Sequence, residues 1–78
     1  MQQQEVQAAE ERAQEAYLRH QAAAELLDRC LKRSRARPTN YREAIKAHMA
    51  WRAVKRARER LHRARDAVLE LFNQEDAR

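Results

Sequence analysis

The chain has 78 residues, of which 44% are apolar and 37% are charged, and its formal net charge at pH 7 is +5. It contains no glycine and one proline. Because tight hairpins and phosphate-cradling loops depend on glycine, sheets are disfavoured, and P-loop and dinucleotide-binding motifs are excluded. A chain of this length forms at most one small domain. Sixteen of its 34 apolar residues are alanine, so we expect a thin core that needs a partner surface.

Residues 4–34 carry the pattern of one long amphipathic helix. Apolar residues recur at alternating spacings of three and four, which are the a and d positions of a heptad repeat. These positions hold Val6, Ala9, Ala13, Ala16, His20, Ala23, Leu27 and Cys30. The adjacent e positions hold Tyr17, Ala24 and Leu31. We expect the e positions to widen the apolar seam, meaning the buried stripe formed by the a and d positions.

The same repeat predicts a second helix over residues 40–73. Its a and d positions hold Ala47, Ala50, Val54, Ala57, Leu61, Ala64, Val68 and Leu71, and its e positions include Ala44, Trp51 and Phe72. Residues 35–39 form the predicted turn, because Pro38 lacks a backbone donor and disfavours helical geometry at Arg37. Asn40 is predicted to cap the second helix, with Glu43 as its reciprocal capping partner.

A short connection between two long helices predicts an all-α fold, in which residues 1–78 form a single antiparallel two-helix hairpin of the coiled-coil type. With the turn centred near residue 37, position i faces about 75 − i. This register brings together Glu10 with Arg65, Glu15 with Arg60, and Val6 with Leu69. Dimerisation, or a partner protein, would complete a four-helix bundle.

Charge is segregated along the chain. Residues 1–28 hold six acids and two bases, residues 29–65 hold fourteen bases and two acids, and residues 66–78 hold four acids and one base. The hairpin is therefore basic at the turn and along the middle, and acidic at its open end. One interpretation is a surface that binds phosphates or an acidic protein face, with candidate nucleic-acid-binding residues Arg52, Lys55, Arg56, Arg60 and Arg63. The other is an ordinary solvated helix face.

A group of apolar residues lies off the seam, close to the turn. Tyr41, Ile45 and Met49 are spaced by four on the second helix, and Leu26 lies on the first. One hairpin does not easily bury both this group and the seam. Leu26, Tyr41, Ile45 and Met49 are therefore candidate partner-binding residues, although packing around the turn with Leu31 would also account for them.

The residues that carry chemistry are scattered. His20, His48 and His62 are separated in the expected register, so no metal site is predicted. His20 occupies an a position and is expected to be partly buried and hydrogen-bonded. Ser34 has no base and acid arranged beside it. We predict no catalytic residues, no cofactor and no small-molecule substrate, and therefore a non-enzymatic protein.

The location of the protein is predicted from its cysteine and its hydropathy. Cys30 is the single cysteine, so an intramolecular disulfide is impossible and a reducing compartment is expected. The N-terminal stretch is polar, and no window approaches 18 consecutive apolar residues. We expect a cytoplasmic protein with no membrane segment.

Pro38-Thr39-Asn40-Tyr41, followed by a long amphipathic helix, resembles the hairpin of the needle-subunit co-chaperones of bacterial type III secretion. Several members of that family open the second helix with a P-x-x-Y stretch. The similarity covers about residues 20–72. The chain departs from the family pattern in its strongly basic charge and its longer, alanine-rich first helix. The resemblance implies a protein that partners a second chaperone to hold a needle subunit soluble.

Two hypotheses from different functional classes follow. The first is a protein–protein interaction module that self-associates or binds a partner, with a small helical chaperone or co-chaperone for a secretion-system subunit as one form. The second is a small basic helical protein that binds nucleic acid through the outer face of its second helix.

Overall fold

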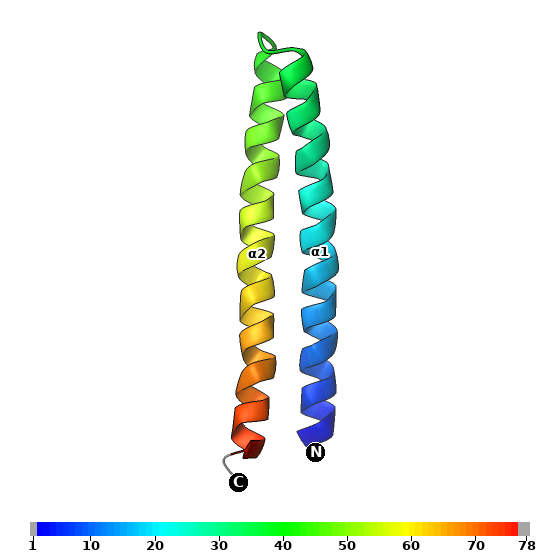
Figure 1. The fold of residues 1–78 in the computed structure, drawn as a ribbon, viewed down its shortest axis with the longest axis vertical. Coiled ribbons are helices and arrows are strands. Elements are labelled where there is room, and N and C mark those ends of the chain that lie inside the picture. The colour runs from blue at the N-terminus through cyan, green and yellow to red at the C-terminus, as the bar shows by residue number, and fades with distance from the viewer. Residues whose placement is uncertain (1, 77–78) are drawn as a thin grey trace.

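The computed structural model describes residues 2–76 as two antiparallel helices. Helix α1 is Gln2–Ala36 and helix α2 is Tyr41–Asp76. The helices lie side by side along their whole length (Figure 1) and form a rod of 60 × 16 × 12 Å. The predicted antiparallel hairpin is confirmed. Helix α1 extends two residues beyond its expected bounds at each end, whereas α2 begins one residue later than expected and ends three residues later. Residues 1, 77 and 78 of the expected hairpin lie outside the described part of the chain.

The turn occupies residues 37–40 and is closed by backbone hydrogen bonds. The Arg37 N–H donates to the Arg33 carbonyl at 3.1 Å, and the Asn40 N–H donates to the Arg37 carbonyl at 3.0 Å. Pro38 has no N–H to offer, so it occupies a turn position where no donor is required. The turn therefore begins and ends later in the chain than the expected residues 35–39.

Asn40 caps helix α2 as predicted. Its side-chain Oδ1 accepts hydrogen bonds from the backbone N–H of Arg42 at 3.0 Å and of Glu43 at 3.4 Å. The expected reciprocal bond from Glu43 is wrong, because the Asn40 N–H is already donated to the Arg37 carbonyl. Within the described residues, Glu43 Oε2 is buried and has no hydrogen-bond partner. The cap is therefore one-sided.

The core is the predicted a/d seam, and alanine dominates it. Every buried apolar residue occupies an a or d position, and the set is Ala9, Cys30, Ala47, Ala50, Val54 and Leu61. Cys30 packs with Ala47, Ala50 and the partly buried Leu27. The expected register placed residue 45 opposite Cys30. The later turn moves the contact further along α2, to Ala47 and Ala50.

The e positions do not widen the seam as expected. Tyr17, Leu31, Trp51 and Phe72 are all exposed, and Trp51 retains 51% of its accessible surface. Two helices bury only the stripe that each presents to the other, so bulky residues flanking that stripe remain uncovered. Among the described residues no large side chain is fully buried. The hairpin therefore buries alanines together with Val54 and Leu61 in the seam and leaves its aromatic side chains at the surface.

The location of the core predicts a contrast between two leucines. Leu61 lies in the seam and is 4% exposed, whereas Leu18 points outward from α1 and is 53% exposed. Leu61→Ala should lower the free energy of unfolding by about 2–4 kcal/mol, and Leu18→Ala by less than about 0.5 kcal/mol. Urea denaturation followed by far-UV circular dichroism measures both. Equal losses at the two positions would contradict the assigned seam.

Candidate interaction surfaces

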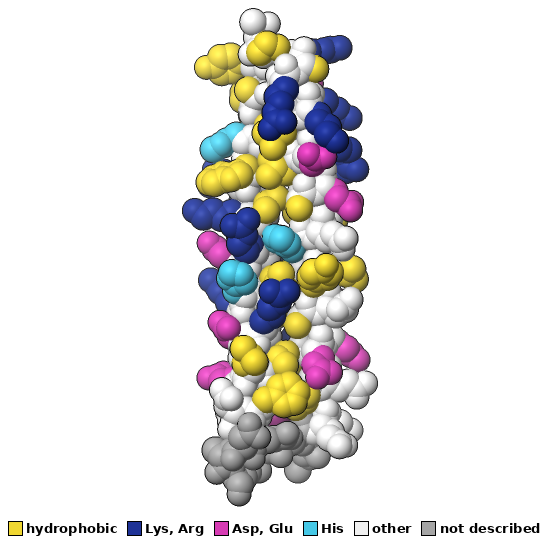
Figure 2. Space-filling model, in the orientation of Figure 1, with side chains coloured by type: hydrophobic (Ala, Val, Ile, Leu, Met, Phe, Trp, Pro, Cys, Tyr) yellow, Lys and Arg dark blue, Asp and Glu magenta, His cyan; other side chains and the backbone are white. Residues whose placement is uncertain are grey.

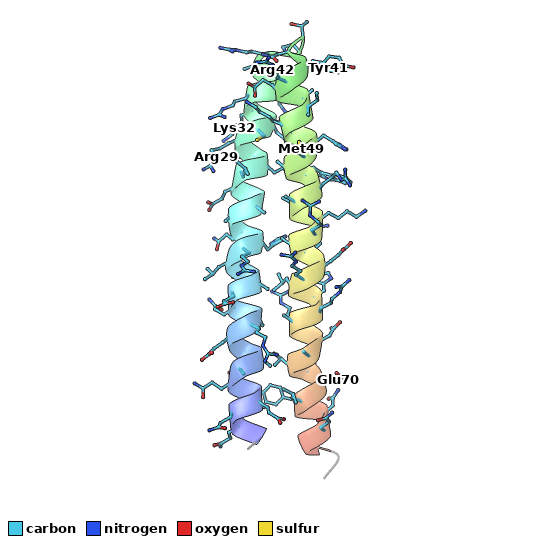
Figure 3. All side chains as sticks on the ribbon, turned by 180° about the vertical axis from the view of Figure 1, so that it is seen from behind. Arg29, Lys32, Tyr41, Arg42, Met49 and Glu70 are labelled. Atoms are coloured by element: carbon cyan, nitrogen blue, oxygen red, sulfur yellow. The ribbon has the colours of Figure 1, made fainter. Side chains whose placement is uncertain are left out.

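The apolar group near the turn is exposed, as its position off the seam indicated. Tyr41 is 82% exposed and Met49 is 64% exposed, and Leu26 and Ile45 are each about half exposed. Figure 3 shows Tyr41 beside the turn and Met49 further along α2. Residues four apart lie on the same face of an α-helix, so Tyr41, Ile45 and Met49 form one exposed stripe on α2. Their role in partner binding stays a prediction.

A second apolar surface lies along one side of the hairpin. We call it the aromatic face, and its large members are Tyr17, Leu31, Trp51 and Phe72, all at e positions. Tyr17 of α1 and Arg65 of α2, which also occupies an e position, line one surface hollow together. The e positions of both helices therefore border the same side. Hydrophobic side chains over both helices are visible along the rod in Figure 2.

Trp51 is held in a small cluster on α2. The His48 ring stacks on it with a centroid separation of 6.1 Å and an interplanar angle of 24°. Lys55 Nζ lies 5.6 Å from the Trp51 ring centroid, within the range of a cation–π interaction. These neighbours steady the indole orientation while half of its surface stays open. Lys55, predicted to contact nucleic acid, thus lies beside Trp51.

The opposite side of the hairpin carries a groove between the helices. We call it the arginine groove. It has a volume of about 510 Å³ and is lined by Arg12, Glu15, Ala16, Arg19, Ala53, Arg56, Ala57, Arg60 and Ala64. The alanines form an apolar floor, and four arginines from two helices surround it. Arg guanidinium groups bind carboxylates and phosphates through paired donors, so the groove is suited to an anionic ligand.

The structure divides the five predicted nucleic-acid-binding residues. Arg56 and Arg60 line the arginine groove, and Arg56 also lines a neighbouring hollow together with Trp51, Arg52 and Lys55. Arg63 is exposed and does not line the groove. Four of the five residues therefore border two hollows that share Arg56, and their role in nucleic-acid binding stays a prediction.

Arg12 and Arg19 were missed as candidate residues. They are the two bases of the otherwise acidic residues 1–28, and both line the groove. The sequence held a signal for them, because Arg12, Arg19 and Arg60 all occupy g positions of their heptads. In an antiparallel pair the g positions of the two helices flank the same side of the seam. The convergence of these arginines on one groove is apparent only when the basic residues of both helices are taken together.

The charge pairs of the expected register are neighbours but not ion pairs. Glu15 and Arg60 line one groove, and Glu10 and Arg65 line the hollow on the other side. The ion pair within the described residues is Lys32–Asp28, at 3.0 Å on the exposed side of α1. The register is thus close to the expected one. Val6 is partly buried while Leu69 is exposed, so that proposed pair contributes little to the core.

Histidine and cysteine complete the inventory of reactive groups. His20 is partly buried in the seam as expected, but its Nε2 atom is buried without a hydrogen-bond partner within the described residues, which corrects the expected bond. Cys30 is a buried free thiol. Across residues 2–76, no three His, Cys, Asp or Glu side chains gather in a way that could hold a metal ion.

The aromatic face and the arginine groove are the two surfaces on which a proposed function is based. Neither described helix has a stretch that is both long enough and apolar enough to cross a lipid bilayer. Comparison with protein-family models, with curated proteins and with solved structures gives no match.

Proposed function

We propose that the chain is a non-enzymatic protein–protein interaction module whose aromatic face packs against another helical surface. The observation that carries this proposal is that small apolar side chains are buried whereas large aromatic ones are exposed. Half of the buried residues are alanine, whereas Tyr17, Trp51 and Phe72 are exposed. Exposed aromatic residues on one side of a small protein are typical of a binding surface.

The geometry of the aromatic face supports a helical partner. Its large members recur at heptad spacing on both helices, so they present a stripe along the rod that matches the side of another helix or hairpin. Docking would convert a two-helix seam into a bundle core and bury the larger side chains. This burial would compensate for the thin core, because burying one such side chain contributes about 1.5–3 kcal/mol to the free energy of unfolding.

The type III secretion resemblance suggests one specific form of this function. A co-chaperone that holds a needle subunit soluble, together with a second chaperone, would need an uncovered helical surface. Tyr41 of the Pro38–Tyr41 stretch is exposed at the turn, so it is free to take part in such a contact with Leu26, Ile45 and Met49. A cytoplasmic location, in keeping with the free thiol of Cys30, is part of the same proposal.

Site-specific photocrosslinking tests the proposed interface without knowledge of the partner. In one chain, benzoylphenylalanine would replace Trp51 on the aromatic face. In a control chain it would replace Leu18, which is also half exposed but points away from the seam. Irradiation of cells expressing each chain should give a discrete covalent adduct from position 51 and little or none from position 18. The mass of the adduct distinguishes a second copy from another protein.

Either of two results would contradict the proposed interface. One is the absence of any adduct from position 51, and the other is equal crosslinking from both positions, which would indicate random collision.

A second candidate function, polyanion binding, is favoured by the convergence of Arg12, Arg19, Arg56 and Arg60 on one groove. Nucleic-acid phosphates are the natural ligand for such a cluster in a chain whose central segment is strongly basic. The apolar floor weighs against this function, since a phosphate backbone gains nothing from it. We therefore place it second.

Electrophoretic mobility shift of a short DNA duplex at several salt concentrations tests polyanion binding. If the groove binds phosphates, changing all four groove arginines to Gln should flatten the dependence of log affinity on log salt by about one for each phosphate that is no longer neutralised. A charge-matched control changes Arg29, Arg42, Arg52 and Arg63 to Gln. Absence of binding at low salt, or equal effects in the two variants, would rule out a groove-specific function.

A further inference from the structure

We propose that the arginine groove is the docking site for an acidic amphipathic helix of a partner protein, which would lie between α1 and α2 as a third helix. This goes beyond the proposed function, because it assigns an occupant to the flank opposite the aromatic face. Three properties of the groove support it: its length, the small side chains along its floor, and the change of its charge along the rod.

The arginine groove continues towards the open end of the hairpin. A second hollow, of about 500 Å³, lies there between the helices, and Arg12 lines both hollows. We call the two hollows together the extended groove. On α1 it runs from Gln4 to Arg19, which is about 22 Å at a rise of about 1.5 Å per residue. This distance corresponds to about four helical turns, so the extended groove has the length of a helical segment.

The floor of the extended groove is made of small side chains. Three alanines line the hollow at the open end and four line the arginine groove, and the single larger apolar residue among the lining residues is Leu71. Six of these alanines are only partly buried, namely Ala8, Ala16, Ala53, Ala57, Ala64 and Ala67. The distance between packed helices depends on the size of the side chains at the contact. The alanine floor therefore allows the apolar face of a third helix to approach closely.

The arginines at the two edges of the groove are able to bind carboxylates of another protein. Arg12, Arg19, Arg56 and Arg60 are all exposed, and within the described residues none of them forms an ion pair. Arg12 and Arg19 are seven residues apart on α1, and Arg56 and Arg60 are four apart on α2. These separations correspond to about 10 Å and about 6 Å along the helix axes. Acidic residues that flank the apolar stripe of a helix recur at the same spacings, so one helix can place carboxylates beside arginines on both edges.

The charge of the extended groove changes along the rod. The arginine groove holds four arginines and one acid, Glu15, whereas the hollow at the open end holds Glu5, Glu70 and the shared Arg12. A nucleic acid is negatively charged along its whole length, so it would meet Glu5 and Glu70 unfavourably. A partner helix whose acidic segment adjoins a neutral or basic segment matches both hollows. The charge pattern therefore favours a protein helix over a nucleic acid and places its acidic segment in the arginine groove.

A fluorescent synthetic peptide of about 20 residues, long enough to fill the extended groove, tests the proposed occupant by fluorescence anisotropy. Alanine fills its a and d positions, glutamate fills the e and g positions of one half, lysine fills those of the other half, and glutamine fills the rest. A control peptide exchanges the charged residues with the glutamines at the outward b and f positions. The first peptide should bind at least about tenfold more tightly than the control, because only its carboxylates flank the stripe that faces the groove.

Paired arginine variants test the charge of the groove, with retained helicity verified by circular dichroism. Arg19→Gln combined with Arg60→Gln removes one arginine from each edge and should weaken peptide binding about tenfold. Arg29→Gln combined with Arg63→Gln is the matched control, because both of these arginines are exposed and neither lines the extended groove. The control pair should weaken peptide binding by less than about twofold.

Ala53→Leu tests the floor without changing the charge. Ala53 is partly buried and lines the groove, so the added volume should hold the peptide away from the floor and weaken its binding about tenfold. Ala44→Leu adds the same volume at an exposed e position on the other flank and should leave peptide binding unchanged. A short DNA duplex, measured in the same buffer, should bind less tightly than the acidic peptide.

No saturable binding of the acidic peptide at about 1 mM, equal binding of the two peptides, or equal effects of the groove and control variants would each overturn this proposal. Tighter binding of the duplex than of the peptide would also overturn it and would assign the groove to nucleic acid. The proposed function fails separately, by the absence of a specific adduct from position 51. The Arg19→Gln and Arg60→Gln changes should leave that adduct intact, because they lie on the other flank of the seam.

Discussion

The small side chains buried in the a/d seam are the constraint on which the rest of the hairpin depends. Ala9, Ala47 and Ala50 are buried there together with Cys30, and small side chains allow the helix axes to approach each other. The same close approach leaves no room between the helices for the aromatic residues. Tyr17, Trp51 and Phe72 are consequently displaced to one flank, so the feature that joins the helices also creates the exposed surface.

The two flanks of the seam differ in charge and are therefore suited to different ligands. Four arginines from both helices converge on the arginine groove, whereas apolar groups dominate the aromatic face. A groove of this kind repels its own copy and attracts anions, and an apolar stripe with large and small residues in alternation favours a helical partner. The two candidate functions therefore rely mainly on opposite flanks of the seam, with Arg56 lining both the arginine groove and the hollow beside Trp51.

The fold followed from the sequence because heptad spacing, a single proline and a capping asparagine all indicated the same hairpin. The a and d positions named in advance contain every buried apolar residue of the described chain. The prediction that the e positions widen the buried seam was wrong. Periodicity shows which residues of a helix are apolar, but it does not show how many helices are present to cover them. Trp51 thus changed from an expected part of the core to the centre of an exposed cluster.

The candidate sites were less accessible to sequence reasoning. Arg56 and Arg60 were identified, but their association with Arg12 and Arg19 depends on which helical faces the turn brings together. The shift of the turn by about two residues also moved Cys30 from a position opposite Ile45 to contact with Ala47 and Ala50. A small displacement of the turn changes which residues of the two helices lie opposite each other along the whole rod. The heptad pattern of each helix therefore predicts which residues are buried but not which side chains are in contact.

The central claim is that the aromatic face packs against another helical surface, either a second copy or a partner protein. Photocrosslinking from position 51, compared with position 18 on the outward side of α1, tests it most directly. The account predicts a discrete covalent adduct from position 51 and little or none from position 18. No adduct from position 51, or equal crosslinking from the two positions, would contradict the account.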